Sequence, residues 1–132
     1  MNSSSLKPIV TKHAPAPVGP YSQAVLANGW LYCSGQIPLH PSSGLIVGEG
    51  DVEVQTRQVI SNLKAVLSAA GGSPSKVVRT TIYLVDLKDV EKVNAIYAET
   101  FMEGTSPARA CVQVTALPKG ARIEIDCIAW LG

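Results

Sequence analysis

The chain has 132 residues, a length that suits one folded domain, and we expect residues 1–132 to form a single unit. Hydrophobic residues make up 46% of it and charged residues 16%, which provides enough apolar material for a core and too little charge for intrinsic disorder. A net charge of +1, the lack of a long basic run, and a content of only one Phe and two Trp argue against nucleic-acid binding.

Three cysteines, Cys33, Cys111 and Cys127, lie in apolar strand-like runs, where small buried thiols are common. Their number is odd and no pair has CxxC spacing, which argues against a disulfide framework and against a zinc site. Residues 1–5 are polar and no apolar signal segment follows them, nor does any run approach the ~18 apolar residues of a membrane span. We therefore expect a soluble, cytoplasmic protein of a reducing compartment.

In chain order, the first predicted elements are a short strand and a stiff loop. Residues 8–12 favour a strand that begins at a proline. Residues 14–22 contain three prolines and a glycine, which exclude a helix and indicate an ordered loop ending near Tyr21. Tyr21 either packs this loop down with its hydroxyl in water, or it presents its ring and hydroxyl at the edge of a site.

A β-hairpin is predicted next. Residues 23–27 and 30–34 are strand-like, and the Asn-Gly pair at 28–29 tolerates the positive φ angles of a tight hairpin turn. At the end of the second strand, Ser34 and the Gly35 amide either donate hydrogen bonds to an anion or simply turn the chain.

Two amphipathic helices with a strand between them follow the hairpin. Asp51 is a favourable N-cap for the first helix, which the glycines at 71–72 end. Its apolar stripe consists of Val52, Val59, Leu63, Val66, Leu67 and Ala70. Residues 77–85 favour a central strand. Asp89 is expected to cap the second helix, whose apolar stripe consists of Val90, Val93, Ile96, Tyr97 and Phe101. Asn94 lies near the edge of this stripe, where a solvated helix residue is the simplest interpretation.

The stretch from Pro107 onward carries one arginine in a run of small and apolar residues. Alternation along a strand that starts at residue 108 places Arg109 and Cys111 on the same face. A guanidinium matches a carboxylate through two parallel hydrogen bonds, so Arg109 suggests a binder of planar anions. The alternative is a surface arginine on a half-exposed strand.

The last predicted strand, at 122–130, separates its charged and apolar residues. Arg122, Glu124 and Asp126 share one face, and the opposite face carries Ile123, Ile125, Cys127 and Ala129. One face of this strand is therefore expected to be buried, while the other is wet or meets a partner.

The order of the elements predicts two β–α–β units, whose helical crossovers join parallel strands. We therefore expect an α+β fold with a six-stranded, partly parallel sheet and two helices on one face. The other face is predicted to carry Arg109 and Glu124, or to be buried by another subunit. An oligomer is favoured because a sheet face is too large and too apolar to leave bare.

Five motifs occur together along the chain: Gly-Pro-Tyr-Ser-Gln-Ala at 19–24, Ser-Gly-Gln-Ile-Pro at 34–38, Val-Asn-Ala at 93–95, Pro-Ala-Arg-Ala-Cys-Val at 107–112 and Ile-Glu-Ile at 123–125. In this combination and order they resemble the RidA family, also called the YjgF/YER057c/UK114 family, of reactive-intermediate deaminases. The resemblance covers nearly the whole chain, from about Ala14 to the C-terminus.

The resemblance implies a chorismate-mutase-like, YjgF-type fold and a homotrimer with a site in each cleft between subunits. It also implies hydrolysis of enamines and imines, such as 2-aminoacrylate and 2-aminocrotonate, to 2-keto acids and ammonia. No cofactor and no metal are expected, and the partners implied are a small imine with a carboxylate and two further copies of the chain, rather than nucleic acid or a membrane.

The resemblance further assigns roles to individual residues. Arg109 corresponds to the arginine that holds the substrate carboxylate, and Glu124 to the glutamate that orients or activates water. The remaining site positions of the family correspond to Tyr21, Ser34, Gly35, Asn94 and Cys111. The loop at 102–106 is short, and Ser106 stands where many members carry an aromatic residue. This departure puts the size of the accepted substrate side chain in doubt, but not the chemistry.

Two other functions stay open at this stage. The same arginine cleft is compatible with a non-enzymatic module that binds 2-keto acids or another small carboxylate. Members of the family have also been described as ribonucleases and translation inhibitors, and against this role stand the near-neutral charge and the few aromatic residues.

Overall fold

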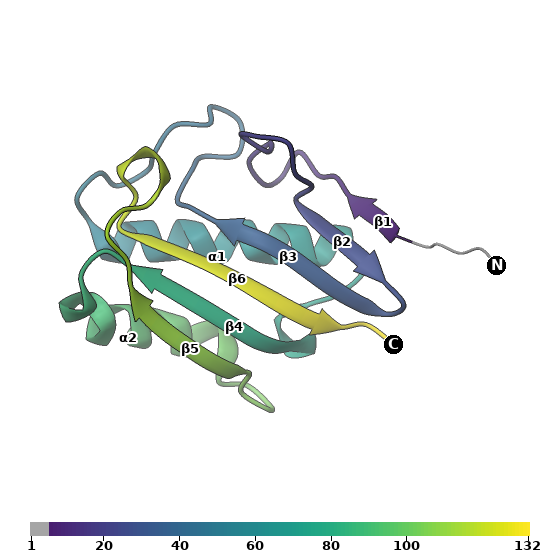
Figure 1. Ribbon diagram of the computed structural model, residues 1–132. Helices are drawn as coiled ribbons and strands as arrows, with labels where there is room; N and C mark the ends of the chain where they lie inside the picture. Colours follow the sequence, from purple (N-terminus) through teal and green to yellow (C-terminus); the bar gives the residue numbers. More distant parts are fainter. Residues whose placement is uncertain (1–5) are drawn as a thin grey trace.

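The computed structural model describes residues 6–132, so the expectations for residues 1–5 lie outside it. Within that range the chain forms a six-stranded sheet and two α-helices (Figure 1). The strands are β1 (Leu6–Ile9), β2 (Ala24–Ala27), β3 (Trp30–Gln36), β4 (Val77–Leu84), β5 (Ala108–Gln113) and β6 (Ile123–Trp130). The helices are α1 (Val52–Ala69) and α2 (Val90–Phe101). None of the helices in this part of the chain is both long and apolar enough to cross a membrane.

The order of strands in the sheet is β1-β2-β3-β6-β4-β5. Only β4 and β5 pair in parallel, and every other neighbouring pair is antiparallel. Because β6 runs antiparallel to both β3 and β4, these two strands point the same way, as the predicted β3–α1–β4 crossover requires. The last strand of the chain is inserted between them, and the predicted mixed sheet of six strands is confirmed.

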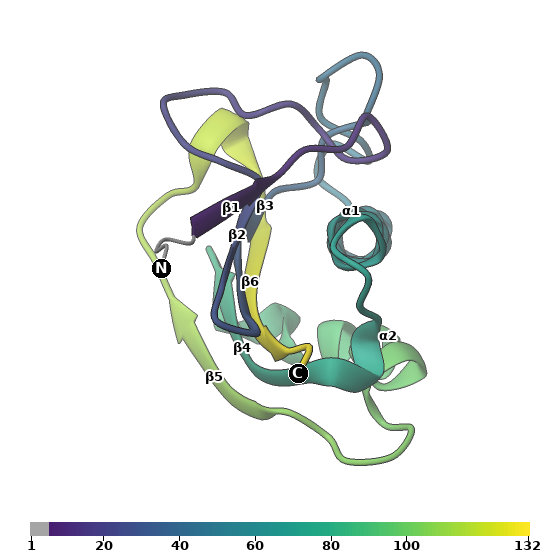
Figure 2. The same cartoon turned by 90° about the vertical axis from the view of Figure 1, so that its right-hand side faces the viewer.

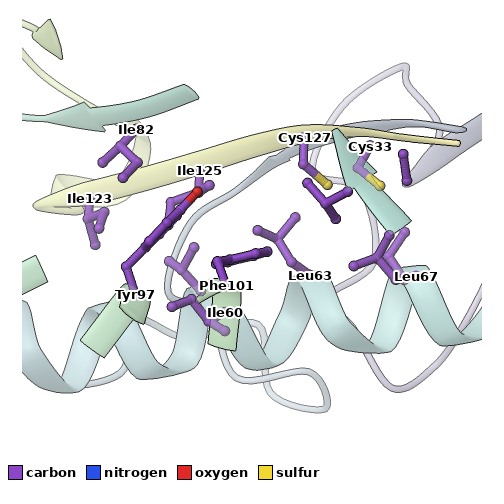
Figure 3. Packing of buried hydrophobic residues seen from close by; sticks show 14 of the residues in the cluster. Cys33, Ile60, Leu63, Leu67, Ile82, Tyr97, Phe101, Ile123, Ile125 and Cys127 are labelled. Carbon is purple, nitrogen blue, oxygen red and sulfur yellow. The ribbon is translucent and has the colours of Figure 1, made fainter. Parts of the chain in front are cut away.

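Both helices lie on one face of the sheet, as predicted, and the other face is open (Figure 2). The core fills the space between the two layers (Figure 3). From β6 it receives Ile123, Ile125, Cys127 and Ala129, all at most 2% exposed. Burying apolar surface of this kind contributes about 25 cal/mol per Å², which makes it the main stabilising term of the fold. The strict alternation on β6 therefore fixes which face of the sheet the helices cover.

Local signals account for most element boundaries. The Asp51 carboxylate accepts hydrogen bonds from the backbone amides of Glu53 and Val54, at 3.0 and 3.2 Å, and so caps α1 as predicted. At the hairpin, Asn28 and Gly29 have φ angles of 54° and 85°, which confirms the predicted turn.

Two expectations about local structure are wrong. The first strand spans Leu6–Ile9 rather than 8–12, because its register is fixed by pairing with β2 rather than by a proline at its start. Asp89 does precede α2, but its side chain caps nothing. Instead its carboxylate lies 2.7 Å from Arg122 Nη2, in an ion pair that only the tertiary fold can form.

Candidate active site

Arg109 lies on the face of the sheet that the helices cover. In the parallel ladder between β4 and β5 it pairs with Thr80, and Cys111 pairs with Ile82. Thr80 and Ile82 are fully buried, and laterally paired residues point to the same side of a sheet. The prediction that Arg109 and Cys111 share a face is therefore confirmed, but the prediction that this is the helix-free face is wrong. Arg109 nevertheless reaches solvent, because β5 is an edge strand.

Two residues of α2 contact the Arg109 guanidinium. Asn94 Oδ1 accepts a hydrogen bond from Nη1 at 2.8 Å. The guanidinium carbon lies over the ring of Tyr97, 5.1 Å from its centroid, which is within the range of a cation–π interaction. Asn94 therefore lies beside the arginine and is more than a solvated helix residue. Tyr97 was expected only as a core residue, and its contact with Arg109 was missed.

Cys111 is half-buried two residues after Arg109 and packs against the edge of the core. Burial raises the pKa of its thiol, an effect that the nearby positive charge of Arg109 only partly offsets. The thiolate, the reactive form, is therefore scarce at neutral pH. Cys111 therefore packs the edge of the core, and its environment does not activate the thiol as a nucleophile.

Glu124 lies on the open face of the sheet, at the end of β6 nearest the 118–120 turn. A Cβ atom at Gly35 would overlap Glu124 Oε2 and would lie only 2.8 Å from its Cδ, so the carboxylate requires a glycine at that position. The carboxyl group is half-buried. Burial, and secondarily the negative charge of Asp126, raise the pKa of Glu124 above its ordinary value.

A cavity of about 320 Å³ opens beside this carboxylate. Its lining residues are Val18, Tyr21, Ser34, Gly35, Ile37, Pro118 and Glu124. Four of the predicted site residues, Tyr21, Ser34, Gly35 and Glu124, thus line one cavity, although they come from three separate parts of the chain. The remaining three residues supply an apolar wall, which suits a ligand with a short alkyl chain.

The hydroxyl groups of Tyr21 and Ser34, two residues that line the cavity, bond to the backbone of the neighbouring loop. The Tyr21 hydroxyl accepts a hydrogen bond from the Val18 amide at 3.2 Å. Ser34 Oγ donates to the Ser22 carbonyl at 2.6 Å, so this hydroxyl braces the loop rather than pointing at a ligand. Ser34 therefore supports the loop at the edge of the cavity.

Gln23 anchors the same loop, and sequence reasoning did not single it out. Its side chain is 3% exposed. Oε1 accepts from the Thr11 amide at 2.8 Å, while Nε2 lies within 3.0, 3.3 and 2.9 Å of the carbonyl oxygens of Thr11, Ala14 and Pro15. A glutamine at the start of a strand, just after a proline-rich loop, was the available signal for this role.

Arg109 and Glu124 do not share a site within one copy of the chain. Glu124 pairs with Tyr83, on the opposite face of β4 from Thr80, the partner of Arg109. In addition, β4 lies between β5, which carries Arg109, and β6, which carries Glu124, so these two strands are roughly 10 Å apart across the sheet. The structure thus divides the predicted residues into two groups: Arg109, Asn94 and Cys111 on one face, and Tyr21, Ser34, Gly35 and Glu124 on the other.

A second cavity and the arrangement of potential metal ligands add no predicted residue to the candidate site. A larger cavity of about 550 Å³ runs between the C-terminal parts of the two helices, and none of the predicted site residues lines it. Among residues 6–132, no three His, Cys, Asp or Glu side chains are arranged to hold a metal ion.

Known proteins resemble this chain over nearly its full length. A family model described as Endoribonuclease L-PSP matches residues 11–131. A RutC family protein of Synechocystis sp. is 54% identical over 127 residues, which cover 96% of this chain and 98% of that protein. The 2-iminobutanoate/2-iminopropanoate deaminase of Mus musculus is 48% identical over 132 residues, covering 100% of this chain and 96% of the mouse protein.

A solved structure of a conserved Rid family protein from Yersinia pestis superposes with a TM-score of 0.92 at 49% identity. The match covers 96% of this chain and 99% of that one. Agreement in fold, length and sequence at this level, together with the motifs that now surround Arg109 and Glu124, leads to one conclusion. The chain belongs to the RidA family.

Proposed function

We propose that this protein is a 2-iminobutanoate/2-iminopropanoate deaminase that hydrolyses small imines to 2-keto acids and ammonia. The observation that supports this most is the pairing of two half-sites of complementary chemistry. One offers an arginine already held by Asn94, and the other offers a carboxylate of raised pKa beside a partly apolar cavity. The deaminase activity in the name of the mouse relative supports the same reaction.

In the proposed mechanism, Arg109 binds the substrate carboxylate through a bidentate pair, which fixes the adjacent imine carbon. Glu124 accepts a proton from water as the water oxygen bonds to that carbon, giving a tetrahedral carbinolamine. The protonated Glu124 then returns the proton to the nitrogen. As the C–N bond breaks and ammonia leaves, the Glu124 carboxylate takes the proton of the carbinolamine hydroxyl and the C=O bond of the 2-keto acid forms. That proton then passes from Glu124 to solvent. A general base contributes typically 10²–10⁴-fold, and positioning adds to this by lowering the entropic cost.

The raised pKa of Glu124 suits this double role. A carboxylate whose pKa lies above its ordinary value is a stronger base toward water, and its acid form exists long enough to protonate a leaving amine. The cavity wall of Val18, Ile37 and Pro118 would accommodate the alkyl chain. No further group is required, because an imine conjugated to a carboxylate is electrophilic once protonated.

The two half-sites can meet only between copies of the chain, so we also propose that the active form is a homotrimer with a site in each cleft. Arg109 would come from one copy and Glu124 from its neighbour. The open face of the sheet supports this arrangement, since it exposes Trp30, Tyr32 and Trp130 by 38–50%. Apolar surface of this extent on one sheet face is typical of an interface.

A coupled assay tests the proposal. A threonine dehydratase generates the enamine in situ, and release of the 2-keto acid is followed with and without this protein. Arg109→Ala should lower kcat/KM by about 100-fold or more, because the carboxylate loses a charge-assisted pair. Glu124→Gln should lower kcat by about 10²–10⁴-fold with little change in KM. Arg57→Ala is a matched control, since Arg57 lies on the exposed side of α1 and pairs with Glu99. Wild-type rates in both site variants would overturn the assignment.

The alternative is a binding module for small carboxylates. Arg109 and the cavity would serve that role equally well, and the two functions differ in rate acceleration alone. If 2-keto acids bind while the imine disappears no faster than in buffer, the binding role is the correct one.

A further inference from the structure

We propose that Tyr97 is a positioning residue for Arg109: its ring, together with Asn94, holds the guanidinium so that the Nε–Nη2 edge is left for the substrate carboxylate. This inference rests on the proposed function, because it assumes that Arg109 binds a carboxylate. It extends that function by naming a residue that touches no substrate and by specifying which edge of the guanidinium binds.

The Tyr97 ring is held firmly on three sides. It is 6% exposed and belongs to the core between the helices and the sheet (Figure 3). Its hydroxyl lies 2.7 Å from Thr80 Oγ1, and its ring centroid lies 4.5 Å from that of Phe101. Thr80 is also the residue of β4 that pairs with Arg109. Thr80 of β4 therefore both pairs with Arg109 and holds the Tyr97 ring that lies beneath the guanidinium.

The guanidinium meets two fixed groups at once. Asn94 and Tyr97 are three residues apart on α2 and so lie on the same side of the helix. Asn94 Oδ1 accepts a hydrogen bond from Nη1 at 2.8 Å, and the centroid of the Tyr97 ring lies 5.1 Å from the guanidinium carbon. Within residues 6–132, Nε and Nη2 donate to no acceptor. The N–H bonds of Nε and one of Nη2 are parallel, which is the geometry of a bidentate carboxylate pair.

This arrangement has a physical benefit for binding. A free arginine side chain has several rotatable bonds, and ordering them on binding opposes affinity. A side chain already confined between an amide and an aromatic face loses less freedom when the ligand arrives. The ring supplies this confinement without competing for the donors, because a cation–π contact uses the face of the guanidinium and leaves its edges unoccupied.

Calorimetric titration with 2-oxobutanoate, a stable product of the proposed reaction, tests the inference. Tyr97→Leu should weaken binding about 3- to 30-fold, as expected for loss of a cation–π contact. Tyr97→Phe should regain most of that affinity, because it keeps the ring and loses only the hydroxyl. In the coupled assay, Tyr97→Leu should raise KM with a smaller effect on kcat, since the carboxylate is bound equally in the ground and transition states.

A second series guards against failure of Tyr97→Leu to fold. Phenylalanine with increasing fluorination at position 97 keeps the volume of the ring while withdrawing charge from its face, so affinity should fall stepwise along the series. Equal affinity across the series, or wild-type affinity in a folded Tyr97→Leu, would overturn the role of Tyr97. A crystal structure of the 2-oxobutanoate complex should show the carboxylate on Nε and Nη2, and a carboxylate on Nη1 would refute the assignment of the edge.

Failure of the proposed function gives a different result. If Arg109→Ala binds 2-oxobutanoate as the wild type does, then Arg109 is not the carboxylate anchor and the proposed function fails at that point. If Arg109→Ala abolishes binding but every Tyr97 variant binds normally, only the present inference fails.

Discussion

Arg109 and Glu124 face opposite sides of one sheet, with β4 between their strands. Neither side of a single copy therefore carries both residues. This relationship also means that the catalytic proposal and the oligomer proposal depend on each other, since the two residues can cooperate only across a subunit boundary.

The pH dependence of the reaction should report the environment of Glu124. Burial, and then the charge of Asp126, raise its pKa above the ordinary value of 4.5. Because the base must be ionised, kcat/KM should fall as the pH drops through this raised pKa, and the acid limb should lie above 4.5. Asp126→Asn removes the repelling charge and should move the acid limb to lower pH. An unchanged limb in this variant would contradict the contribution of Asp126 to the pKa of the titrating base.

The same shift has a consequence for stability. A carboxyl group whose pKa is higher in the folded state than in the unfolded state binds protons more tightly when folded, so it opposes folding once the pH exceeds its unfolded pKa. Glu124→Gln should therefore be more stable than the wild type at neutral pH. The gain should be complete above the raised pKa of the folded state and should shrink as the pH falls from there to the unfolded pKa. Urea unfolding at several pH values measures this, and a gain that does not vary with pH would contradict it.

A side chain at Gly35 should displace the Glu124 carboxylate. A methyl group there would overlap Glu124 Oε2, so Gly35→Ala must displace the carboxylate from its present position. We expect kcat to fall by about 10-fold or more while the fold is retained, because misplacing a catalytic group by about 1 Å can cost 10²-fold. Gly19→Ala is the matched control, since its methyl would meet the Tyr21 ring at an ordinary contact distance of 3.5 Å. Equal rates in the two variants would argue against the position assigned to Glu124.

Gln23 should contribute to stability through the buried amide that anchors the proline-rich loop. Gln23→Ala leaves the Thr11 amide and the Pro15 carbonyl without their hydrogen-bond partner. Each buried polar group left unsatisfied in this way lowers stability by about 1–3 kcal/mol. Gln23→Glu should be worse, because a carboxylate cannot donate to the carbonyl oxygens that Nε2 now reaches. Denaturant unfolding measures both variants. Gln113→Ala serves as the control, as Gln113 makes an exposed hydrogen bond to the Leu87 amide, and equal losses in Gln23→Ala and Gln113→Ala would contradict this prediction.

The architecture could be predicted from the sequence because it depends on local patterns. Alternation on β6 and the helical stripes specify which residues are buried, and Asp51 and the turn at Asn28 specify boundaries. The actual position of β6, between β3 and β4, was not predictable in this way, since pairing between strands distant in sequence leaves no local mark.

The site was harder to predict than the fold for the same reason. Alternation showed that Arg109 and Cys111 share a face, but it could not tell which face the helices cover at an edge strand. It also could not reveal the partner that Asp89 chooses over capping α2, namely Arg122. The role of Tyr97 was hidden because a core residue and a support for Arg109 have the same sequence signature, an aromatic residue in an apolar stripe.

The central claim is that Arg109 of one copy and Glu124 of another form each site, and subunit mixing tests it most directly. Arg109→Ala and Glu124→Gln are co-expressed with different tags, and the mixed oligomers are purified through both tags and assayed. Each variant alone should be nearly inactive. The purified mixed trimers should regain about a third of the wild-type activity, because one of the three sites in each mixed trimer unites an intact arginine with an intact glutamate. Mixed oligomers that remain as inactive as the parent variants would show that the two residues do not act together across a subunit boundary.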